Sequence, residues 1–280
     1  MSEGSAAGGP APGGPAVERV VVADGAAAAA QAAALFADAA RRAVAARGRF
    51  VVALAGGSTP KAAYALLADA SLAGGAALGP DVWGATHVWF GDERCVPPDS
   101  ADSNYRMAHE ALLARVPVPA GQVYRIEGER APEDAAARYD ALLRGEAVAG
   151  RDAAAVREGA AVPRDPVGAP VFDFVLLGVG PDGHTASLFP GTPGLEERAR
   201  WAIAVAAPVA LTPKVPRVTL TFPALDAARE VMVLAVGAEK RDAVRAALGG
   251  GGDMPPSGRV RGRERTVWVL DDAAAGEGRT

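Results

Sequence analysis

A histidine and an aspartate lie close together in the glycine-rich segment GVGPDGHTASLFP, residues 178–190. The segment follows the apolar run VFDFVLLG, whose length and composition predict a buried strand. We therefore expect Asp182 and His184 at the carboxyl end of that strand, with His184 near the start of a helix over 183–189. Histidine has the ordinary pKa best suited to a general base near neutral pH, so His184 is a candidate base.

The glycines of this segment allow two interpretations. Gly178, Gly180 and Gly183 match G-x-G-x-x-G, a dinucleotide-binding fingerprint, or they only free the backbone so that Asp182 and His184 face a substrate. The fingerprint requires an acidic residue about 20 positions further on, at the end of the next strand, to bind the ribose. The next predicted strand, RWAIAVAAP, ends without one. The pattern therefore favours acid–base chemistry over a bound redox cofactor.

The stretch RFVVALAGGSTPK combines an apolar strand, a polar turn and a predicted helix start. Gly56 and Gly57 permit close approach of the backbone, and Ser58 and Thr59 add hydroxyl donors beside the unpaired N–H groups of the helix. Such a helix N-terminus binds anions readily. The alternative is an ordinary helix start capped by Ser58 or Thr59. We favour a phosphate site.

A third polar loop, WFGDERC, carries Asp92, Glu93 and Arg94 at the end of a predicted strand. Charges exposed at such a place indicate either function or a solvated loop. Cys95 follows Arg94 and is a conceivable nucleophile, but no histidine is adjacent to it in the sequence. An inert thiol is therefore its expected state.

The fourth polar loop, LTPKVPRVTLTF, places Lys214 and Arg217 around two prolines beside another predicted strand. The two side chains either form a cationic clamp for a phosphorylated ligand or belong to a basic, stiffened loop. In open parallel sheets, ligands bind outside the carboxyl ends of the strands. We therefore expect the four polar loops to meet in one site.

Strands and helices alternate almost throughout the chain, and several strands are apolar on both faces. This pattern predicts an α/β fold with a mostly parallel sheet covered by helices on both faces. The predicted strands are VERVVVADG, RFVVALAGG, ATHVWFGDE, QVYRIEG, VFDFVLLGVG, RWAIAVAA, RVTLTFPAL, EVMVLAVG and TVWVLDD. The predicted helices cover residues 26–47, 58–70, 103–116, 132–148, 183–189, 223–229 and 238–248.

The two ends and one internal segment differ in composition from the rest of the chain. Residues 1–16 are rich in Gly, Pro and Ala, which is typical of a disordered tail, and 272–280 are predicted to form a second tail. Residues 149–170 show no clear period, which indicates a surface loop or a variable insertion. We expect a single α/β domain over 17–271.

The composition excludes several classes of partner. A net charge of −4 argues against nucleic acid, since neutralising phosphates needs a basic surface. No run reaches the roughly 18 uninterrupted apolar residues of a membrane helix, and the N-terminus lacks the features of a signal peptide. The single cysteine cannot form an intramolecular disulfide, which fits a cytoplasmic location. No zinc-type His/Cys spacing and no dense carboxylate set occur, so we expect no metal.

Together these motifs resemble the 6-phosphogluconolactonases. LAGGSTPKAAY, VWFGDERCVPPDSADSNYRM, FDFVLLGVGPDGHTASLFPGTP and PKVPRVTLTFPAL follow the order of that family, and the resemblance spans residues 17–271. It implies a Rossmann-like, doubly wound α/β fold without a nucleotide, as in the similar glucosamine-6-phosphate deaminases. It also implies hydrolysis of 6-phospho-D-glucono-1,5-lactone to 6-phospho-D-gluconate in the oxidative branch of the pentose phosphate pathway, without a cofactor.

The resemblance also implies how the substrate is bound. The sugar phosphate would sit on the turn formed by residues 56–59, with cationic help from Lys214 and Arg217. Arg94 would either stabilise negative charge on the lactone carbonyl oxygen or bind the phosphate. The implied partner is this small-molecule lactone, and both a monomer and a homodimer are compatible with the sequence.

The implied chemistry is water attack with a histidine base. His184 would activate the water, and Asp182 and Asp92 would orient His184, Arg94 or the sugar hydroxyls. Deaminases typically have D-G-H-I-A-F-N-E-P, and Phe189 stands here at the position of their glutamate. This disfavours a deaminase or isomerase. A non-catalytic sugar-phosphate sensor is disfavoured because it needs no base, and a dinucleotide-binding oxidoreductase is the third alternative.

Overall fold

The computed structural model describes residues 16–69, 77–146, 148, 162–208, 212–249 and 254–276. Apart from residue 16, the predicted tail 1–16 lies outside the described residues. The same holds for 149–161 of the predicted loop or insertion and for 277–280 of the predicted C-terminal tail.

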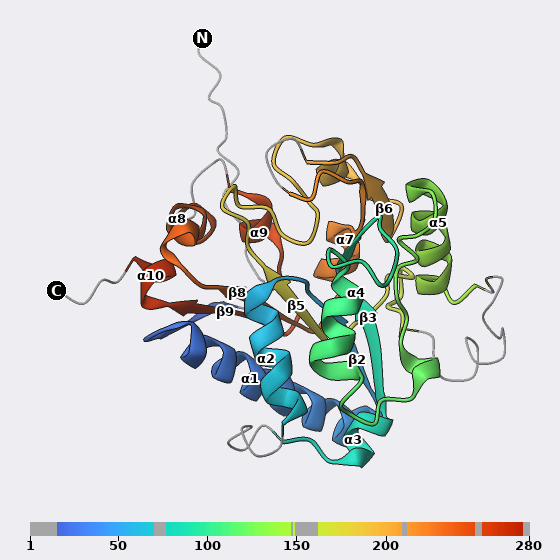
Figure 1. Cartoon of the computed structure of the whole chain (residues 1–280), viewed down its shortest axis with the longest axis horizontal. Coiled ribbons are helices and arrows are strands. Elements are labelled where there is room, and N and C mark those ends of the chain that lie inside the picture. Colours follow the sequence, from blue (N-terminus) through green and yellow to red (C-terminus); the bar gives the residue numbers. More distant parts are fainter. Residues whose placement is uncertain are drawn as a thin grey trace, which may run out of the picture.

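Six parallel strands form the main sheet, in the order β1-β9-β8-β5-β2-β3 (Figure 1). Their bounds are β1 Val17–Val22, β2 Phe50–Leu54, β3 Thr86–Phe90, β5 Phe174–Gly178, β8 Glu230–Ala235 and β9 Arg265–Asp271. Every residue of β2 is buried, as expected for a central strand covered on both faces. The chain continues from β2 to β3 on one side and later to β5 on the other. A topological switch point therefore lies between β2 and β5.

Helices cover the two faces of this sheet, with α1 and α2 on one side and α8 and α9 on the other (Figure 1). The helix bounds are α1 Gly25–Arg47, α2 Ser58–Ala68, α3 Pro80–Gly84, α4 Asn104–Ala108, α5 Pro132–Leu143, α7 Phe222–Asp226, α8 Arg241–Leu248, α9 Pro256–Arg259 and α10 Asp272–Ala275. A π-helical turn, His109–Leu113, extends α4, and 3₁₀ turns occur at Ala120–Gln122, Pro193–Glu196 and Ala238–Lys240. In the described part of the chain, no helix has both the length and the apolar character needed to span a membrane.

Three short antiparallel strands form a second sheet in the order β4-β7-β6. They are β4 Asp92–Arg94, β6 Ala202–Val205 and β7 Arg217–Leu220. β4 follows β3 after one residue, and its register places Arg94 directly opposite Arg217. The sequence predicted β6 and β7 as strands, but it joined Asp92 and Glu93 to the strand that becomes β3. The separate sheet was not predicted, because apolar periodicity does not report which strands pair.

Residues 183–189 form a turn, and the helix predicted there is wrong. Gly183 has a φ of 81° and Ala186 a φ of 47°, both outside the helical region. The N–H of Ser187 donates to Thr219 Oγ1 and its hydroxyl donates to Asp92 Oδ2, at 3.1 and 2.6 Å. Ser187 is therefore bonded to the second sheet instead of to a helical neighbour.

Two other segments differ from the prediction. The expected strand QVYRIEG makes only an isolated bridge between Val123 and Val88, at the edge of the main sheet. Residues 272–275, predicted as part of a tail, form α10 instead. Asp271 caps this helix by accepting the N–H of Ala274 at 2.8 Å, and Ala274 is fully buried. Burial of that side chain against the sheet explains why the helix forms.

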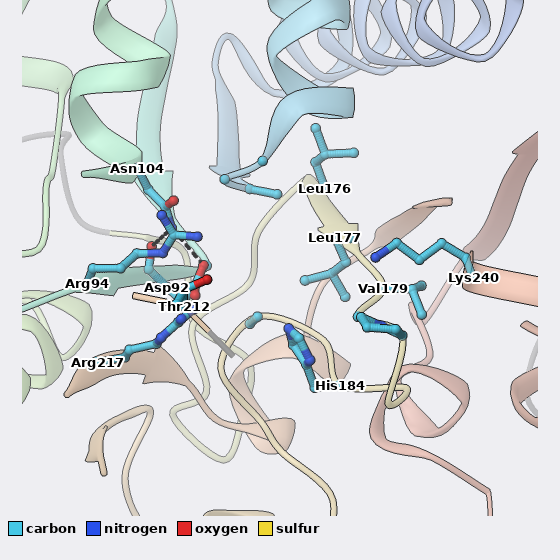
Figure 2. Close-up of a pocket in the computed structure, with 18 residues that line it drawn as sticks. Asp92, Arg94, Asn104, Leu176, Leu177, Val179, His184, Thr212, Arg217 and Lys240 are labelled. Carbon is cyan, nitrogen blue, oxygen red and sulfur yellow. Dashed lines mark hydrogen bonds between the residues drawn. The ribbon is translucent and has the colours of Figure 1, made fainter. Parts of the chain in front are cut away.

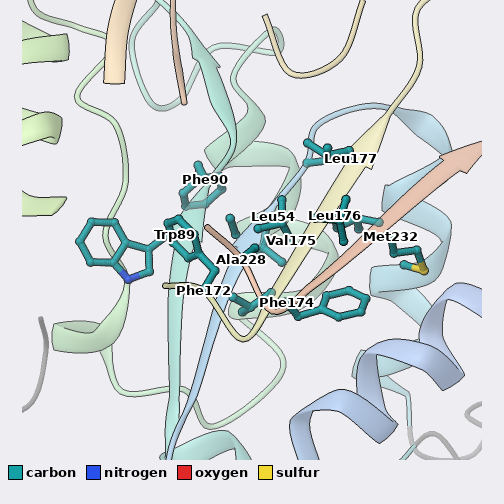
Figure 3. Packing of buried hydrophobic residues seen from close by; sticks show 14 of the residues in the cluster. Leu54, Trp89, Phe90, Phe172, Phe174, Val175, Leu176, Leu177, Ala228 and Met232 are labelled. Atoms are coloured by element: carbon teal, nitrogen blue, oxygen red, sulfur yellow. The ribbon is translucent and has the colours of Figure 1, made fainter. Parts of the chain in front are cut away.

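The core beneath the switch point consists of aromatic and aliphatic side chains from neighbouring elements (Figure 3). Phe36 of α1 packs edge-on against Phe50 and Phe174, with 5.3 and 6.0 Å between ring centroids. Phe90 and Leu176 are buried toward the carboxyl ends of β3 and β5. This packing fixes the strand ends from which the polar loops leave.

Candidate active site

A cavity of about 260 Å³ opens at the carboxyl ends of β2 and β5 (Figure 2). Gly56 and Gly57 line it after β2, and residues 176–181 line it from β5 and the following turn. This is the switch point, where open parallel sheets bind ligands. The other polar lining residues are Asp92, Arg94, Asn104, His184, Thr212, Arg217 and Lys240.

The turn that carries His184 depends on its glycines. The N–H of Gly180 donates to the carbonyl of His184 at 2.9 Å, which closes the turn. A side chain at position 180 would overlap the imidazole ring, and Gly183 adopts the left-handed backbone region that glycine tolerates best. The space over Gly180 is thus filled by the histidine and is not open to a pyrophosphate. This geometry supports the acid–base interpretation of the three glycines.

His184 and Asp182 form a hydrogen-bonded pair. His184 Nδ1 lies 2.5 Å from Asp182 Oδ1. The other ring nitrogen, Nε2, does not take part in this bond. Burial acts to raise the pKa of Asp182, but the hydrogen bond and the charge of His184 outweigh it and hold that pKa below its usual value. Of the two, only His184 lines the cavity, and Asp182 lies behind it.

Replacing Asp182 with asparagine is expected to lower kcat about tenfold with little change in KM. The amide keeps the shape but loses the charge that fixes the imidazole tautomer. The expected loss is modest because 41% of the Asp182 side chain is exposed to water. Steady-state kinetics of the variant check this, and a rise in KM with unchanged kcat would contradict the orienting role.

Asp92 is buried and bonded to two neutral donors. Its carboxylate accepts the Ser187 hydroxyl at 2.6 Å and the Asn104 amide at 3.0 Å. Among the described residues its hydrogen bonds go to Asn104 and Ser187 and not to His184 or Arg94, two of the groups named from the resemblance. Because Asp92 lines the cavity, the third expectation, contact with the sugar hydroxyls, stays a prediction. No group of three or more His, Cys, Asp or Glu suited to a metal ion occurs in the part of the chain that the structure describes.

Glu93 holds the start of α4 against β4. Its buried carboxylate accepts the N–H groups of Arg94, Asn104 and Tyr105 and the hydroxyl of Ser103, all between 2.7 and 2.9 Å. Burial raises the pKa of Glu93, although these four donors oppose the shift. Glu93 thereby fixes Asn104 in the lining of the cavity.

Arg94 and Arg217 form a pair of like charges on one side of the cavity (Figure 2). Arg217 is only 4% exposed, and within the described ranges it makes no ion pair and its Nε has no partner. Burial lowers the pKa of Arg217, and the facing Arg94 lowers it further while Asp92 opposes both. Glu93 and Asp102 also favour the charged form, but none of these carboxylates forms a direct ion pair with Arg217, so the two arginines are suited to an anionic ligand.

Besides Asp182, three residues expected in the site lie outside the cavity lining. Ser58 and Thr59 belong to the first turn of α2, and the N-cap position, which the alternative interpretation gave to one of them, is occupied by Gly57. Lys214 is exposed on the loop before β7. A polar residue close to a strand end in the sequence need not point into the site, because the conformation of its loop decides the direction of its side chain.

Lys240 is a lining residue that sequence reasoning missed. It reaches the cavity from the side opposite the arginine pair, with His184 between them in the view of Figure 2. It follows β8, the neighbour of β5, after Gly237 with a φ of 99°. A strand followed by glycine and a nearby lysine is the signal that points to it.

Cys95 is expected to be a slowly reacting thiol. Burial raises its pKa to about 11, with the charges of Glu93 and Glu133 adding to the shift. Because the thiolate is the reactive form, alkylation at neutral pH should be slower than for glutathione and should accelerate as the pH approaches that value. Mass spectrometry of iodoacetamide-treated protein measures this. Cys95→Ser should keep full turnover, and loss of activity would reopen the nucleophile hypothesis.

Comparison with known proteins identifies related sequences and folds. A profile of the family described as Glucosamine-6-phosphate isomerases/6-phosphogluconolactonase matches residues 23–268. A 6-phosphogluconolactonase of Streptomyces coelicolor is 39% identical over 216 residues, which cover 74% of this chain and 76% of that protein. The chloroplastic 6-phosphogluconolactonase 3 of Arabidopsis thaliana is 34% identical over 235 residues, 82% of this chain and 65% of its own length. The structure of 6-phosphogluconolactonase from Trypanosoma brucei matches with a TM-score of 0.77 and 32% identity, covering 93% of this chain and 98% of that one.

Proposed function

This chain belongs to the glucosamine-6-phosphate isomerase/6-phosphogluconolactonase family, and from that premise we propose that it hydrolyses 6-phosphoglucono-1,5-lactone to 6-phosphogluconate. One observation carries the proposal. The His184–Asp182 pair and the buried Arg217, with no ion pair among the described residues, belong to one site. Water attack on a carbonyl needs a positioned base and a cation for the charge that develops.

The site offers positive charge in two places, at Lys240 and at the pair Arg94 and Arg217. The reaction has two negative groups to match them, the substrate phosphate and the developing carbonyl oxyanion. We assign the sugar phosphate to Gly56, Gly57 and the N–H groups at the start of α2, which no described side chain caps, with Lys240 supplying charge. Arg94 and Arg217 are assigned to the charge that develops on the lactone carbonyl oxygen. Arg217 thus takes a different role from the phosphate clamp expected from the sequence.

The chemical step proceeds without a covalent enzyme intermediate. His184 Nε2 accepts a proton from water as its oxygen attacks the carbonyl carbon. The bond between that carbon and the ring oxygen then breaks, and the proton held by His184 passes to the ring oxygen, which becomes a hydroxyl. The product is the open-chain acid. Asp182 holds the imidazole in position during both transfers.

The test is hydrolysis of freshly prepared 6-phosphogluconolactone, compared with its spontaneous rate and without added metal or nucleotide. We expect a clear acceleration, followed as acid release or by coupled oxidation of 6-phosphogluconate. Ammonia release from glucosamine 6-phosphate provides a second arm and should stay at background. Binding of 6-phosphogluconate without any acceleration would instead indicate a sugar-phosphate sensor.

We also propose a cytoplasmic location with the lactone as the binding partner. The location is supported by the single, half-buried cysteine, since chains without disulfides suit a reducing compartment. Fractionation of cells followed by immunodetection tests the location.

A further inference from the structure

We propose that Phe189 is a positioning residue that holds both His184 and Arg217 from behind the cavity, an inference that rests on the proposed function. The centroid of its ring lies 4.8 Å from that of the His184 ring, and Arg217 Cζ lies 5.7 Å from it. Phe189 is not among the described residues that line the cavity. It therefore acts on the reaction through the proposed base and one proposed cation.

Phe189 is a neighbour of Arg217 that stabilises its charge without forming an ion pair with it. Its guanidinium is buried, faces Arg94 across β4 and β7, and has no ion pair within the described ranges. The face of an aromatic ring carries negative electrostatic potential and attracts a cation, most strongly where water is excluded. A carboxylate in place of the ring would bind the arginine directly and compete with the anionic transition state. An aromatic ring leaves the arginine donors available to substrate.

His184 needs a contact that fixes the plane of its ring. The bond from Nδ1 to Asp182 holds one edge, but a single hydrogen bond still permits the ring to tilt. Phe189 packs against the imidazole at an interplanar angle of 51° and limits this tilt. Phe189 itself is only 7% exposed, and its carbonyl accepts the hydroxyl and the N–H of Thr192 at 2.8 and 3.3 Å.

Because one ring contacts both His184 and Arg217, its loss should have a specific kinetic effect. Loss of the ring should disturb both the proposed base, His184, and Arg217, the cation proposed to stabilise the oxyanion. We therefore expect kcat to fall. The phosphate contacts assigned to Gly56, Gly57 and Lys240 lie in other loops and should keep their affinity. Competitive inhibition by inorganic phosphate reports on those contacts separately.

The experiment compares Phe189→Leu with Phe222→Leu. Phe222 is a matched control because it is similarly buried and Arg259 Cζ lies 4.6 Å from the centroid of its ring. Neither Phe222 nor Arg259 lines the cavity. We expect kcat to fall about tenfold in Phe189→Leu, as for loss of a desolvated cation–π contact and a misplaced base. The inhibition constant for phosphate should not change. Phe222→Leu should keep the wild-type kcat even if its melting temperature falls.

Two further variants separate the role of the ring from simple packing. Phe189→Tyr keeps the ring and should restore most of kcat, whereas Phe189→Met keeps the volume but lacks the ring and should not. In an Arg217→Met background the effect of Phe189→Leu should shrink from about tenfold to about threefold, because contacting residues are not additive.

Several outcomes would overturn the inference. They are equal kcat losses in the two leucine variants, full activity in Phe189→Met, and additive effects with Arg217→Met. If Phe189→Leu does not fold, the comparison of the tyrosine and methionine variants decides the question. Failure of the wild-type protein to accelerate lactone hydrolysis would instead remove the proposed function on which this inference rests.

Discussion

Replacement of His184 with alanine is expected to lower kcat for lactone hydrolysis by about 10²- to 10⁴-fold, the usual contribution of a positioned general base. The alanine removes Nε2 but leaves the glycine turn after β2 and all the cationic lining residues. Affinity for 6-phosphogluconate, measured by calorimetry, should therefore change little. Turnover is measured against the spontaneous rate, because the lactone also hydrolyses in water.

The matched control for this variant is His109→Ala. His109 is exposed on the π-helical turn after α4 and lies outside the cavity lining. Its replacement should leave kcat and KM at wild-type values. A near-normal rate in His184→Ala, with the control also normal, would refute the role proposed for His184.

Replacement of Arg217 with methionine is expected to lower kcat/KM by about 10- to 100-fold. This range corresponds to loss of a hydrogen bond to a charged group in a site that excludes water. The same change should leave the free energy of unfolding equal or higher. Methionine fills similar space and removes a buried charge that has no ion pair among the described residues. Kinetics and chemical denaturation measure the two effects separately.

Arg261→Met provides the control for this prediction. Burial also lowers the pKa of Arg261, but Arg261 lies outside the cavity lining. Its replacement should not change kcat/KM. We predict that Arg217 stabilises the bound anion and does not stabilise the folded protein. An Arg217→Met protein with full activity, or one that is strongly destabilised, would contradict this prediction.

Most of the main sheet could be predicted from the sequence. Continuous apolar runs such as 50–54 and 174–178 form buried parallel strands because both of their faces are covered. The first helix was also predicted closely. Asp24 caps it, and Gly48 ends it in the left-handed backbone region. These are local signals, carried by residues next to each other in the chain.

The second sheet and the turn 183–189 could not be predicted in the same way. The turn is decided by bonds from Ser187 to Asp92 and Thr219, which are 95 and 32 positions away in the sequence. Lys240 and Asn104 were likewise missed as lining residues, since each enters the cavity through the fold of an element far from His184. Lys214 was placed in the site because it is close in sequence to Arg217, but its side chain lies on an exposed loop.

The sequence by itself determined the α/β class, the strand end that carries His184, and the need for glycine beside it. Those features depend on periodicity and on backbone freedom, which are properties of short segments. Only the tertiary structure decided that Arg94 faces Arg217, that Asp182 rather than Asp92 contacts the histidine, and that Phe189 lies against both His184 and Arg217. Strand register and long-range hydrogen bonds bring these groups together, and neither can be recognised from the periodicity of the sequence.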